Sequence, residues 1–320
     1  MPTLQFVFSH ISSPLTQIGV MGPLTRLGSL LSCTPSFATW WDRFCRGTSA
    51  WQVELTVTVF VQLVGFWLPA TIYQLIDVCF PNCSRAHKHQ PDPRRQPNGR
   101  QIAHCIRYAF FVTLGDIALQ IGFGYLTDFR PVFIISPTLP TLKETMRQFA
   151  YGNIAREVLA YYVHRVLHHP QLYARHHKLH HSFTAPIAFT GLYTTPVEHF
   201  FADIIPIVLP LALIAHFWEP VHILSFNIFL ISVLLVGTAE HSGYDFAQPP
   251  VSKAHDLHHE KFNVNYGSLH FMDWLHGTNV SERGSLDGRE GNRRTWNFNE
   301  NTLIRRLLHP WTIKHIPGWD

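Results

Sequence analysis

The feature that most constrains this chain is a set of four apolar runs, each close to the length that crosses a lipid bilayer. An α-helix needs about 20 apolar residues to span the hydrocarbon core. Two runs contain no charged residue and two contain one aspartate each; they are residues 55–75, 108–126, 200–218 and 221–239. Because a backbone inside lipid must satisfy its own hydrogen bonds, these runs predict membrane-spanning helices.

The composition agrees with membrane insertion. Charged residues make up 14% of the chain and apolar residues 46%, whereas a soluble domain has about 25% charged residues. Four buried helices in a large soluble protein are the alternative, and the low charge argues against it. A formal charge of +4 is too small to indicate a nucleic-acid-binding surface. We therefore expect an all-α, multi-pass membrane bundle with four to five spans.

Charge placement predicts the orientation of this bundle. Residues 84–100, between the first two runs, carry five arginines and lysines, so the positive-inside rule places this loop in the cytoplasm. Glu219 and Pro220 predict a tight reversal between the last two runs. A fifth segment, residues 145–163, contains three charged residues, so we expect it to pack against its neighbours or to lie in the interface. If it crosses the membrane, every histidine cluster described below lies on the cytoplasmic side.

These patterns divide the chain into four predicted parts. Residues 1–48 are a divergent N-terminal segment without the pattern of a cleaved secretory signal. Residues 49–144 carry the first spans and the basic loop, residues 145–280 form a catalytic domain, and residues 281–320 are a polar tail. Five cysteines without a CxxC pair describe no zinc site or disulfide framework, which favours a reducing compartment.

Histidine is the residue type with unusual spacing. The chain contains 22 histidines, and three clusters follow metal-ligand patterns: an HxxxH cluster and two HxxHH clusters. These are His164 and His168; His177, His180 and His181; and His255, His258 and His259. Residues three and four apart are neighbours on a helix, so we expect each cluster to direct its imidazoles at one spot. The clusters thus predict metal binding.

The number of imidazoles indicates two metal ions. Eight exceed the four ligands of a structural zinc and the three of a catalytic zinc. A carboxylate di-iron bundle would need paired Glu-x-x-His motifs, and the single such spacing, Glu219 to His222, falls at the predicted reversal. An HExxH protease motif is also absent, because residue 263 is Asn263. All-histidine ligation beside membrane spans favours an iron pair over zinc.

The ordered clusters resemble a known family when they are taken with their neighbours. Supporting motifs are Pro196-Val-Glu198-His199, His241-Ser-Gly-Tyr-Asp245 and Asn265-Tyr266-Gly267. Over residues 145–280 the chain resembles the fatty acid hydroxylase superfamily, especially its sterol desaturase and C-4 methylsterol oxidase branch. The resemblance implies a multi-pass protein of the endoplasmic reticulum membrane with a cytoplasmic di-iron site. It also implies the use of dioxygen, with electrons from NAD(P)H through cytochrome b5 and its reductase.

The resemblance assigns roles to individual residues. It implies nine iron ligands: His164, His168, His177, His180, His181, His241, His255, His258 and His259. Glu157, on the same helix face as His164, and Asp256 are expected to orient ligand imidazoles. Thr195 is a departure, because sterol oxidases often have histidine before this proline, so a tenth ligand is unassigned. With no His-Pro-Gly-Gly haem motif, the electron donor is expected to be a separate protein.

The expected substrate is a hydrophobic lipid that resides in the membrane, such as a sterol or terpenoid. Hydroxylation, desaturation and oxidation of a methyl group are all compatible with the residues. Three alternatives stay open at this point: a hydroxylase of fatty-acyl lipids, a histidine-rich zinc-binding membrane protein without redox chemistry, and a relative that keeps the fold as a binding protein. Transporters place ionisable ligands within their spans, whereas these clusters lie between or after them.

Overall fold

A computed structural model of the chain describes residues 36–280. This part is all-α, as predicted, and two isolated bridges, Lys88–Tyr244 and Ile134–His222, take the place of any sheet within it. Most of the predicted segment 1–48 and all of the predicted tail 281–320 lie outside the described residues. The chain forms two compact units. Among the described residues, one unit comprises residues 36–48 with 136–139, and the other comprises residues 49–135 and 140–280.

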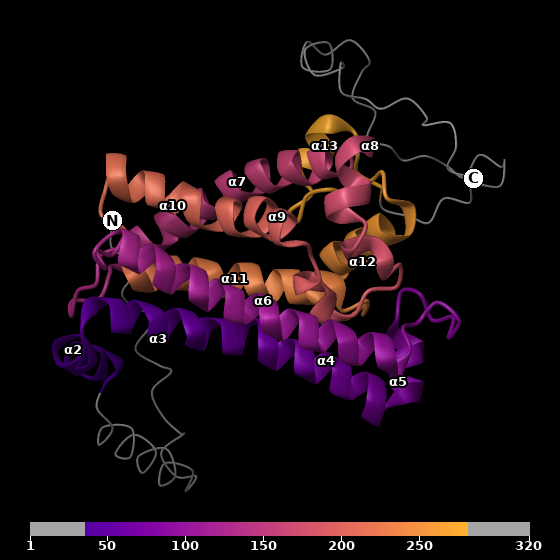
Figure 1. Ribbon diagram of the computed structural model, residues 1–320, viewed down its shortest axis with the longest axis horizontal. Helices are drawn as coiled ribbons and strands as arrows, with labels where there is room; N and C mark the ends of the chain where they lie inside the picture. The colour runs from indigo at the N-terminus through magenta and orange to yellow at the C-terminus, as the bar shows by residue number, and fades with distance from the viewer. Residues whose placement is uncertain (1–35, 281–320) are drawn as a thin grey trace, which may run out of the picture. The chain divides into compact units, whose positions relative to one another are not determined.

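The first unit contains helix α2 (Phe37–Gly47), which Ser36 caps with its side chain. The second unit contains the other helices of residues 36–280, which are drawn in Figure 1. Its long elements are α3 (Ala50–Gln62), α4 (Leu68–Cys79), α6 (Gly99–Leu126), α7 (Leu142–Leu167), α10 (Ile205–Phe217) and α11 (Ile223–His241). Its shorter helices are α5 (Pro81–His87), α8 (Pro170–Leu172), α9 (Pro196–Glu198), α12 (Pro249–Lys261) and α13 (Phe271–His276). Its π- and 3₁₀-turns are η1 (Leu63–Trp67), η2 (Tyr173–His177), η3 (His180–Ser182), η4 (Ala188–Leu192) and η5 (His199–Ile204).

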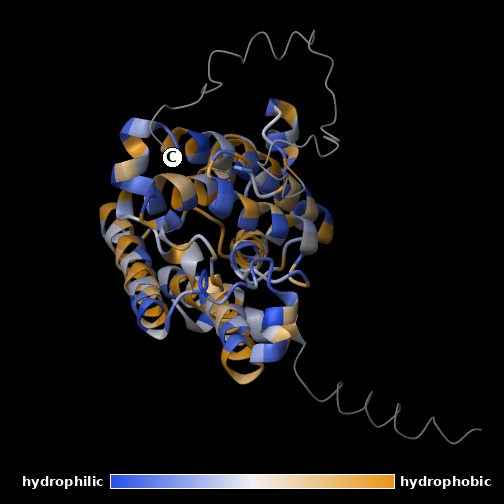
Figure 2. Ribbon diagram, turned by 90° about the vertical axis from the view of Figure 1, so that its right-hand side faces the viewer, coloured by the Kyte–Doolittle hydropathy of each residue, from blue (hydrophilic) through white to orange (hydrophobic). Residues whose placement is uncertain are grey.

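Four continuous helical rods are long and apolar enough to cross a membrane: Ala50–Cys79, Gly99–Leu126, Pro196–Phe217 and Ile223–His241. Each overlaps one of the four predicted runs, and the chain reverses between α10 and α11 at Glu219 and Pro220, as predicted. Large apolar side chains on these rods point outward; Leu126 is 86% exposed and Phe111 is 68% exposed. Figure 2 shows hydrophobic residues recurring along the long helices. Such surfaces are stable where lipid covers them.

Helix α7 contains the predicted fifth segment, and it packs against neighbours as expected. It lies along α10 and α11. Near its N-terminal end, Arg147 forms an ion pair with Glu219, and Gln148 donates a hydrogen bond to the carbonyl of Pro220 at 3.1 Å. Its C-terminal end carries His164. Helix α7 therefore runs from the α10–α11 reversal to the histidine clusters, over roughly 39 Å for its 26 residues.

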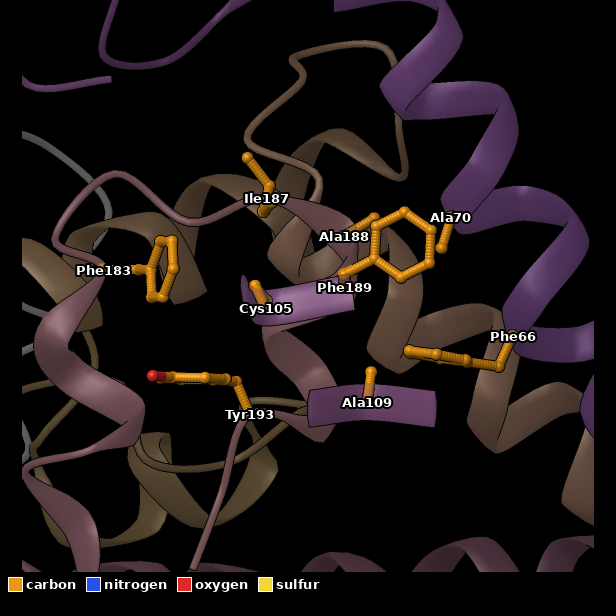
Figure 3. Packing of buried hydrophobic residues seen from close by; sticks show 9 residues of the cluster. All are labelled: Phe66, Ala70, Cys105, Ala109, Phe183, Ile187, Ala188, Phe189 and Tyr193. Atoms are coloured by element: carbon orange, nitrogen blue, oxygen red, sulfur yellow. The ribbon is translucent and has the colours of Figure 1, made fainter. Parts of the chain in front are cut away.

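A buried apolar cluster joins the first two rods to the segment after the second histidine cluster. Figure 3 shows its members, which come from η1, α4, α6 and residues 183–193. Phe66 and Phe189 meet edge to face with ring centroids 6.1 Å apart, and Phe183 meets Tyr193 in the same way at 5.2 Å. This packing fixes residues 183–193 against the membrane helices and so fixes the histidines that precede them.

Gly152 provides a test of the α7–α11 packing. A Cβ atom on Gly152 would lie 3.0 Å from the ring of Phe229, which is itself fully buried. We expect Gly152→Ala to lower the free energy of unfolding by about 1–3 kcal/mol through overpacking. Gly115→Ala is the matched control, because nothing lies within 4 Å of its Cβ position and alanine favours a helix by up to about 1 kcal/mol. Thermal unfolding in detergent measures both, and equal stabilisation by the two changes would contradict the packing.

Candidate metal centre

All nine histidines predicted as ligands lie together at one end of the long helices. They form two groups, and within each group the ligand nitrogens lie within 4.8 Å of one another. The five-histidine group is His164, His168, His177, His181 and His258. The four-histidine group is His180, His241, His255 and His259. Six of the nine side chains are buried and the other three are half-buried. The two groups adjoin, since the ring centroids of His181 and His259 are 4.8 Å apart.

The second and third clusters divide between the two groups, which corrects the expectation that each cluster directs its imidazoles at one spot. Helix α12 places His255 and His259 in the four-histidine group and His258 in the five-histidine group. Consecutive helical residues point about 100° apart, whereas residues i and i+4 lie one above the other. The adjacent pair in an HxxHH motif therefore faces two different centres. In the second cluster, His177 of the π-turn η2 and His181 of the 3₁₀ turn η3 belong to the five-histidine group, whereas His180, the neighbour of His181 in η3, belongs to the four-histidine group.

Backbone carbonyls fix the tautomers of several imidazoles. In four histidines the Nδ1 atom donates to a carbonyl oxygen: His164 to Tyr266 at 2.7 Å, His258 to Val264 at 2.7 Å, His259 to Phe183 at 3.0 Å and His241 to Gly237 at 2.7 Å. A neutral imidazole carries one proton. Because that proton is on Nδ1, the Nε2 atom of each ring presents a lone pair to the centre of its group.

The Nε2 atoms within each group converge to within about 3 Å of one another. In the five-histidine group, His177 Nε2 is 3.0 Å from His168 Nε2, and His258 Nε2 is 3.1 Å from His181 Nε2. In the four-histidine group, His255 Nε2 is 2.9 Å from His241 Nε2. The Nε2 atom of His164 is buried and has no hydrogen-bond partner. A cation at the centre of each group would receive these lone pairs, so the donor sets fit metal ions.

Burial keeps these imidazoles in the form that binds a metal. It lowers the pKa of each of the eight histidines outside the apolar rods, and repulsion from neighbouring imidazoles lowers the pKa of His168, His181 and His255 further. The unprotonated imidazole is the metal ligand. At pH 7 the site therefore presents neutral nitrogen donors.

One carboxylate that orients a ligand was missed at the sequence level. Glu198 Oε1 accepts a hydrogen bond from His177 Nδ1 at 2.6 Å, with both side chains almost fully buried. Thr195 positions this residue: its hydroxyl caps α9 by accepting from the Glu198 amide at 3.3 Å and donates to the His176 carbonyl at 2.8 Å. The Pro-x-Glu motif was the signal, but its spacing alone does not reveal which imidazole the glutamate meets.

Glu157 and Asp256, the two predicted orienting carboxylates, are hydrogen-bonded to groups next to the site. Glu157 Oε2 accepts from the amides of Ser268 and Leu269 at 3.1 and 2.9 Å. It thereby fixes the segment whose Tyr266 carbonyl anchors His164, one step removed from the ligand. Asp256, buried on α12, accepts a hydrogen bond from Gln90 at 3.1 Å.

Gln90 belongs to a short segment of the basic loop, residues 88–90, that bonds to both sides of the site. Its amide also donates to the carbonyl of Thr184 at 2.7 Å, just after the second histidine cluster. Lys88 Nζ donates to the Ser242 carbonyl at 2.9 Å, next to His241, and lies 4.2 Å from the ring centroid of Tyr244. Sequence reasoning assigned this loop an orienting charge alone. In the structure it ties the first two rods to the histidine groups.

With this geometry established, comparisons with known proteins identify the domain. Residues 149–278 match the sequence model of the fatty acid hydroxylase family, described as "Fatty acid hydroxylase". This stretch is a fatty acid hydroxylase domain, the class that the histidine motifs predict. It contains all nine histidines and Glu198, whereas Gln90 and Lys88 lie outside it.

Relatives of known name agree with this assignment. The chain is 39% identical to human fatty acid hydroxylase domain-containing protein 2 over 143 residues, which cover 44% of this chain and 41% of that protein. It is 30% identical to fatty acid hydroxylase ahd1 of Mycosarcoma maydis, covering 60% and 49%. It is 27% identical to methylsterol monooxygenase 1 of Danio rerio, covering 73% and 80%. The matched region spans less than half the length of the first two of these relatives. No solved structure matches the chain.

Glu198 gives a direct test of the site. We expect Glu198→Ala to lower metal affinity by roughly 10- to 100-fold, because His177 loses the acceptor that orients its ring. Glu198→Gln keeps an acceptor oxygen and should lose less. Metal retained after dialysis against graded chelator concentrations is the measurement. Asp92→Asn, which removes an exposed carboxylate bonded to Arg94, is the control; loss of metal in it equal to that in Glu198→Ala would contradict a specific role.

Proposed function

We propose that this protein is a membrane-bound, non-haem di-iron oxygenase that uses dioxygen to hydroxylate, desaturate or oxidise a methyl group of a hydrophobic lipid such as a sterol or terpenoid. The observation that carries the proposal is the pair of buried histidine groups with converging Nε2 atoms. The fatty acid hydroxylase domain and the similarity to methylsterol monooxygenases support it.

The five- and four-histidine groups would each hold one iron ion. When bound, the iron pair supplies the reduction of dioxygen and the oxidation of an unactivated C–H bond. The chain's own residues supply a neutral donor set, fixed by carbonyls and by Glu198, in a site from which burial excludes water. Five imidazoles in one group exceed the four ligands that structural zinc takes, which favours iron over the zinc-binding alternative.

The substrate class is inferred from the surroundings of the site. The histidine groups lie at the ends of apolar rods whose outer faces suit lipid, so a substrate dissolved in the bilayer can approach without crossing water. Hydroxylation of a fatty-acyl lipid is the second candidate, favoured by the similarity to two proteins named for fatty acid hydroxylation.

The orientation of the site is inferred from the basic loop. Residues 88–90 of this loop lie against the site, so the loop and the site share one face, and the positive-inside rule predicts that this face is cytoplasmic. We propose the endoplasmic reticulum membrane as the location.

Metal analysis of two ligand variants tests the proposal. Purified wild-type protein is expected to hold about two iron ions per chain and to consume dioxygen when a lipid substrate is present. His258→Ala and His255→Ala each remove a donor from one group, so each should lower the iron content towards about one ion and abolish turnover while membrane insertion persists. His216→Ala, at the opposite end of α10, is the control. Zinc in place of iron, with no dioxygen consumption, would favour the zinc-binding alternative.

We also propose that electrons arrive from a separate protein, because the chain has no haem motif, no dinucleotide-binding glycine motif and no cysteine cluster for iron–sulfur. Protein given lipid substrate, dioxygen and NAD(P)H should be inactive until cytochrome b5 and its reductase are added. Arg165, Lys178, Lys253 and Lys261 lie beside the clusters in sequence and would attract an acidic donor. Product that fades as salt rises would support this docking surface, and product formed without any donor protein would contradict a separate donor.

A further inference from the structure

A small pocket lies far from the metal centre, between the start of α3 and the end of α6. Its volume is about 40 Å³, and its walls include Trp51, Glu54, Gln120, Phe129 and Arg130. That volume exceeds the roughly 10–15 Å³ needed to hold one water molecule, so a small polar group fits. The two helices supply polar and aromatic side chains here, whereas most of their surface is apolar.

The pocket lies at the membrane surface opposite the histidine groups. The loop that bonds to the elements of the histidine groups precedes the N-terminal end of α6, which runs along the other long helices (Figure 1). The residues that line the pocket lie at the C-terminal end of the same helix and directly after it. A helix of 28 residues is roughly 40 Å long, which exceeds the hydrocarbon core of about 30 Å. Trp51, at the start of the first rod, is the kind of residue that marks the headgroup level. The pocket therefore opens where lipid headgroups lie.

A strained turn forms one wall of the pocket. Asp128 and Phe129 both have positive φ angles, 50° and 53°, and a bulky residue such as phenylalanine rarely adopts this conformation. The turn places the Phe129 ring against Gly124, where a Cβ atom would lie 2.7 Å from the ring. It also brings this ring to 5.4 Å from the Trp51 ring. Backbone strain of this kind is retained where the surrounding structure enforces it, often at ligand sites.

The pocket has one acidic and one basic side chain, and they do not form an ion pair with each other. Glu54 and Arg130 both line it, yet within residues 36–280 neither takes part in an ion pair. Glu54 is half-buried in the first rod and meets the side chain of Gln120, a neutral partner. A carboxylate at this depth without a cation beside it is costly. A ligand that carries a cation and an anion a short distance apart would neutralise both. The aromatic faces of Trp51 and Phe129 would add cation–π attraction to the cationic end.

We propose that this pocket binds the headgroup of a zwitterionic phospholipid, with the ammonium group at Glu54 and the aromatic rings and the phosphate at Arg130. The bilayer itself supplies this ligand, because the pocket opens at the level of the headgroups. The site is independent of the metal centre and does not rest on the proposed oxygenase activity. It anchors the ends of α3 and α6 to the leaflet opposite the histidine groups.

Native mass spectrometry of the full-length protein in detergent tests the proposal, with phosphatidylcholine as the probe and phosphatidylglycerol, which lacks the ammonium group, as the comparison. We expect one retained phosphatidylcholine per chain and weaker retention of phosphatidylglycerol. Glu54→Gln and Arg130→Gln should each reduce phosphatidylcholine retention by roughly tenfold, the effect of losing a charge-assisted contact. Loss of the Glu54 charge should leave phosphatidylglycerol retention unchanged or stronger.

Two further variants keep the test sharp. Asp128→Asn removes a charge from the same turn without lining the pocket and keeps a residue type that tolerates positive φ, so retention should match wild type. Gly124→Ala displaces the Phe129 ring and should weaken retention although both charges remain. Equal retention of phosphatidylcholine in wild type, Glu54→Gln and Arg130→Gln would overturn the proposal, as would equal dependence of both lipids on Arg130 alone, which would indicate a simple phosphate site.

Discussion

The structure depends on the convergence of nine imidazole nitrogens on two points. A metal ion can bind at these points only if the rings keep their unprotonated nitrogens turned inward, so the protein must hold each ring from its other side. It does so by hydrogen bonds on the far side of the rings, such as that from His258 Nδ1 to the Val264 carbonyl at 2.7 Å. The histidines that donate lie on α7, α11 and α12, and the accepting carbonyls lie in α11 and in segments outside the helices. The packing of the helices therefore determines where the ligand nitrogens lie.

π-Turns and 3₁₀ turns replace regular α-helix near several residues of the site, and they change the direction in which these side chains point. His177 lies in the π-turn η2, His180 and His181 lie in a 3₁₀ turn, and Glu198 ends α9 directly before the π-turn η5. π-Turns inside helices occur frequently at functional sites. Here they rotate a side chain out of the register that an unbroken helix would give it. The second and fourth rods, α6 and α11, are unbroken α-helices, whereas the first and third rods each contain one π-turn, η1 and η5. A π-turn keeps the backbone hydrogen-bonded within its own helix, as a backbone in lipid requires.

Much of this architecture follows from the sequence, because apolar length and histidine spacing are local patterns. The four rods, the reversal at Glu219 and Pro220, and the nine clustered histidines all have such a signal. The division of each HxxHH motif between two groups was not predicted, because it depends on which neighbours surround the helix. Glu198 and Gln90 were missed for a related reason. A carboxylate 21 residues from His177, or an amide 166 residues from Asp256, becomes a partner only when the tertiary structure brings them together.

The bonds from Lys88 and Gln90 to the site have a mechanical consequence. These residues follow directly from α4 and α5, so the first rod is coupled to the carbonyl of Ser242 and to α12. A transmembrane rod tilts when its apolar length exceeds the thickness of the bilayer. Because Lys88 bonds next to His241 and Gln90 bonds to α12, the first rod cannot change its tilt independently of the elements that carry the histidine groups unless these bonds break.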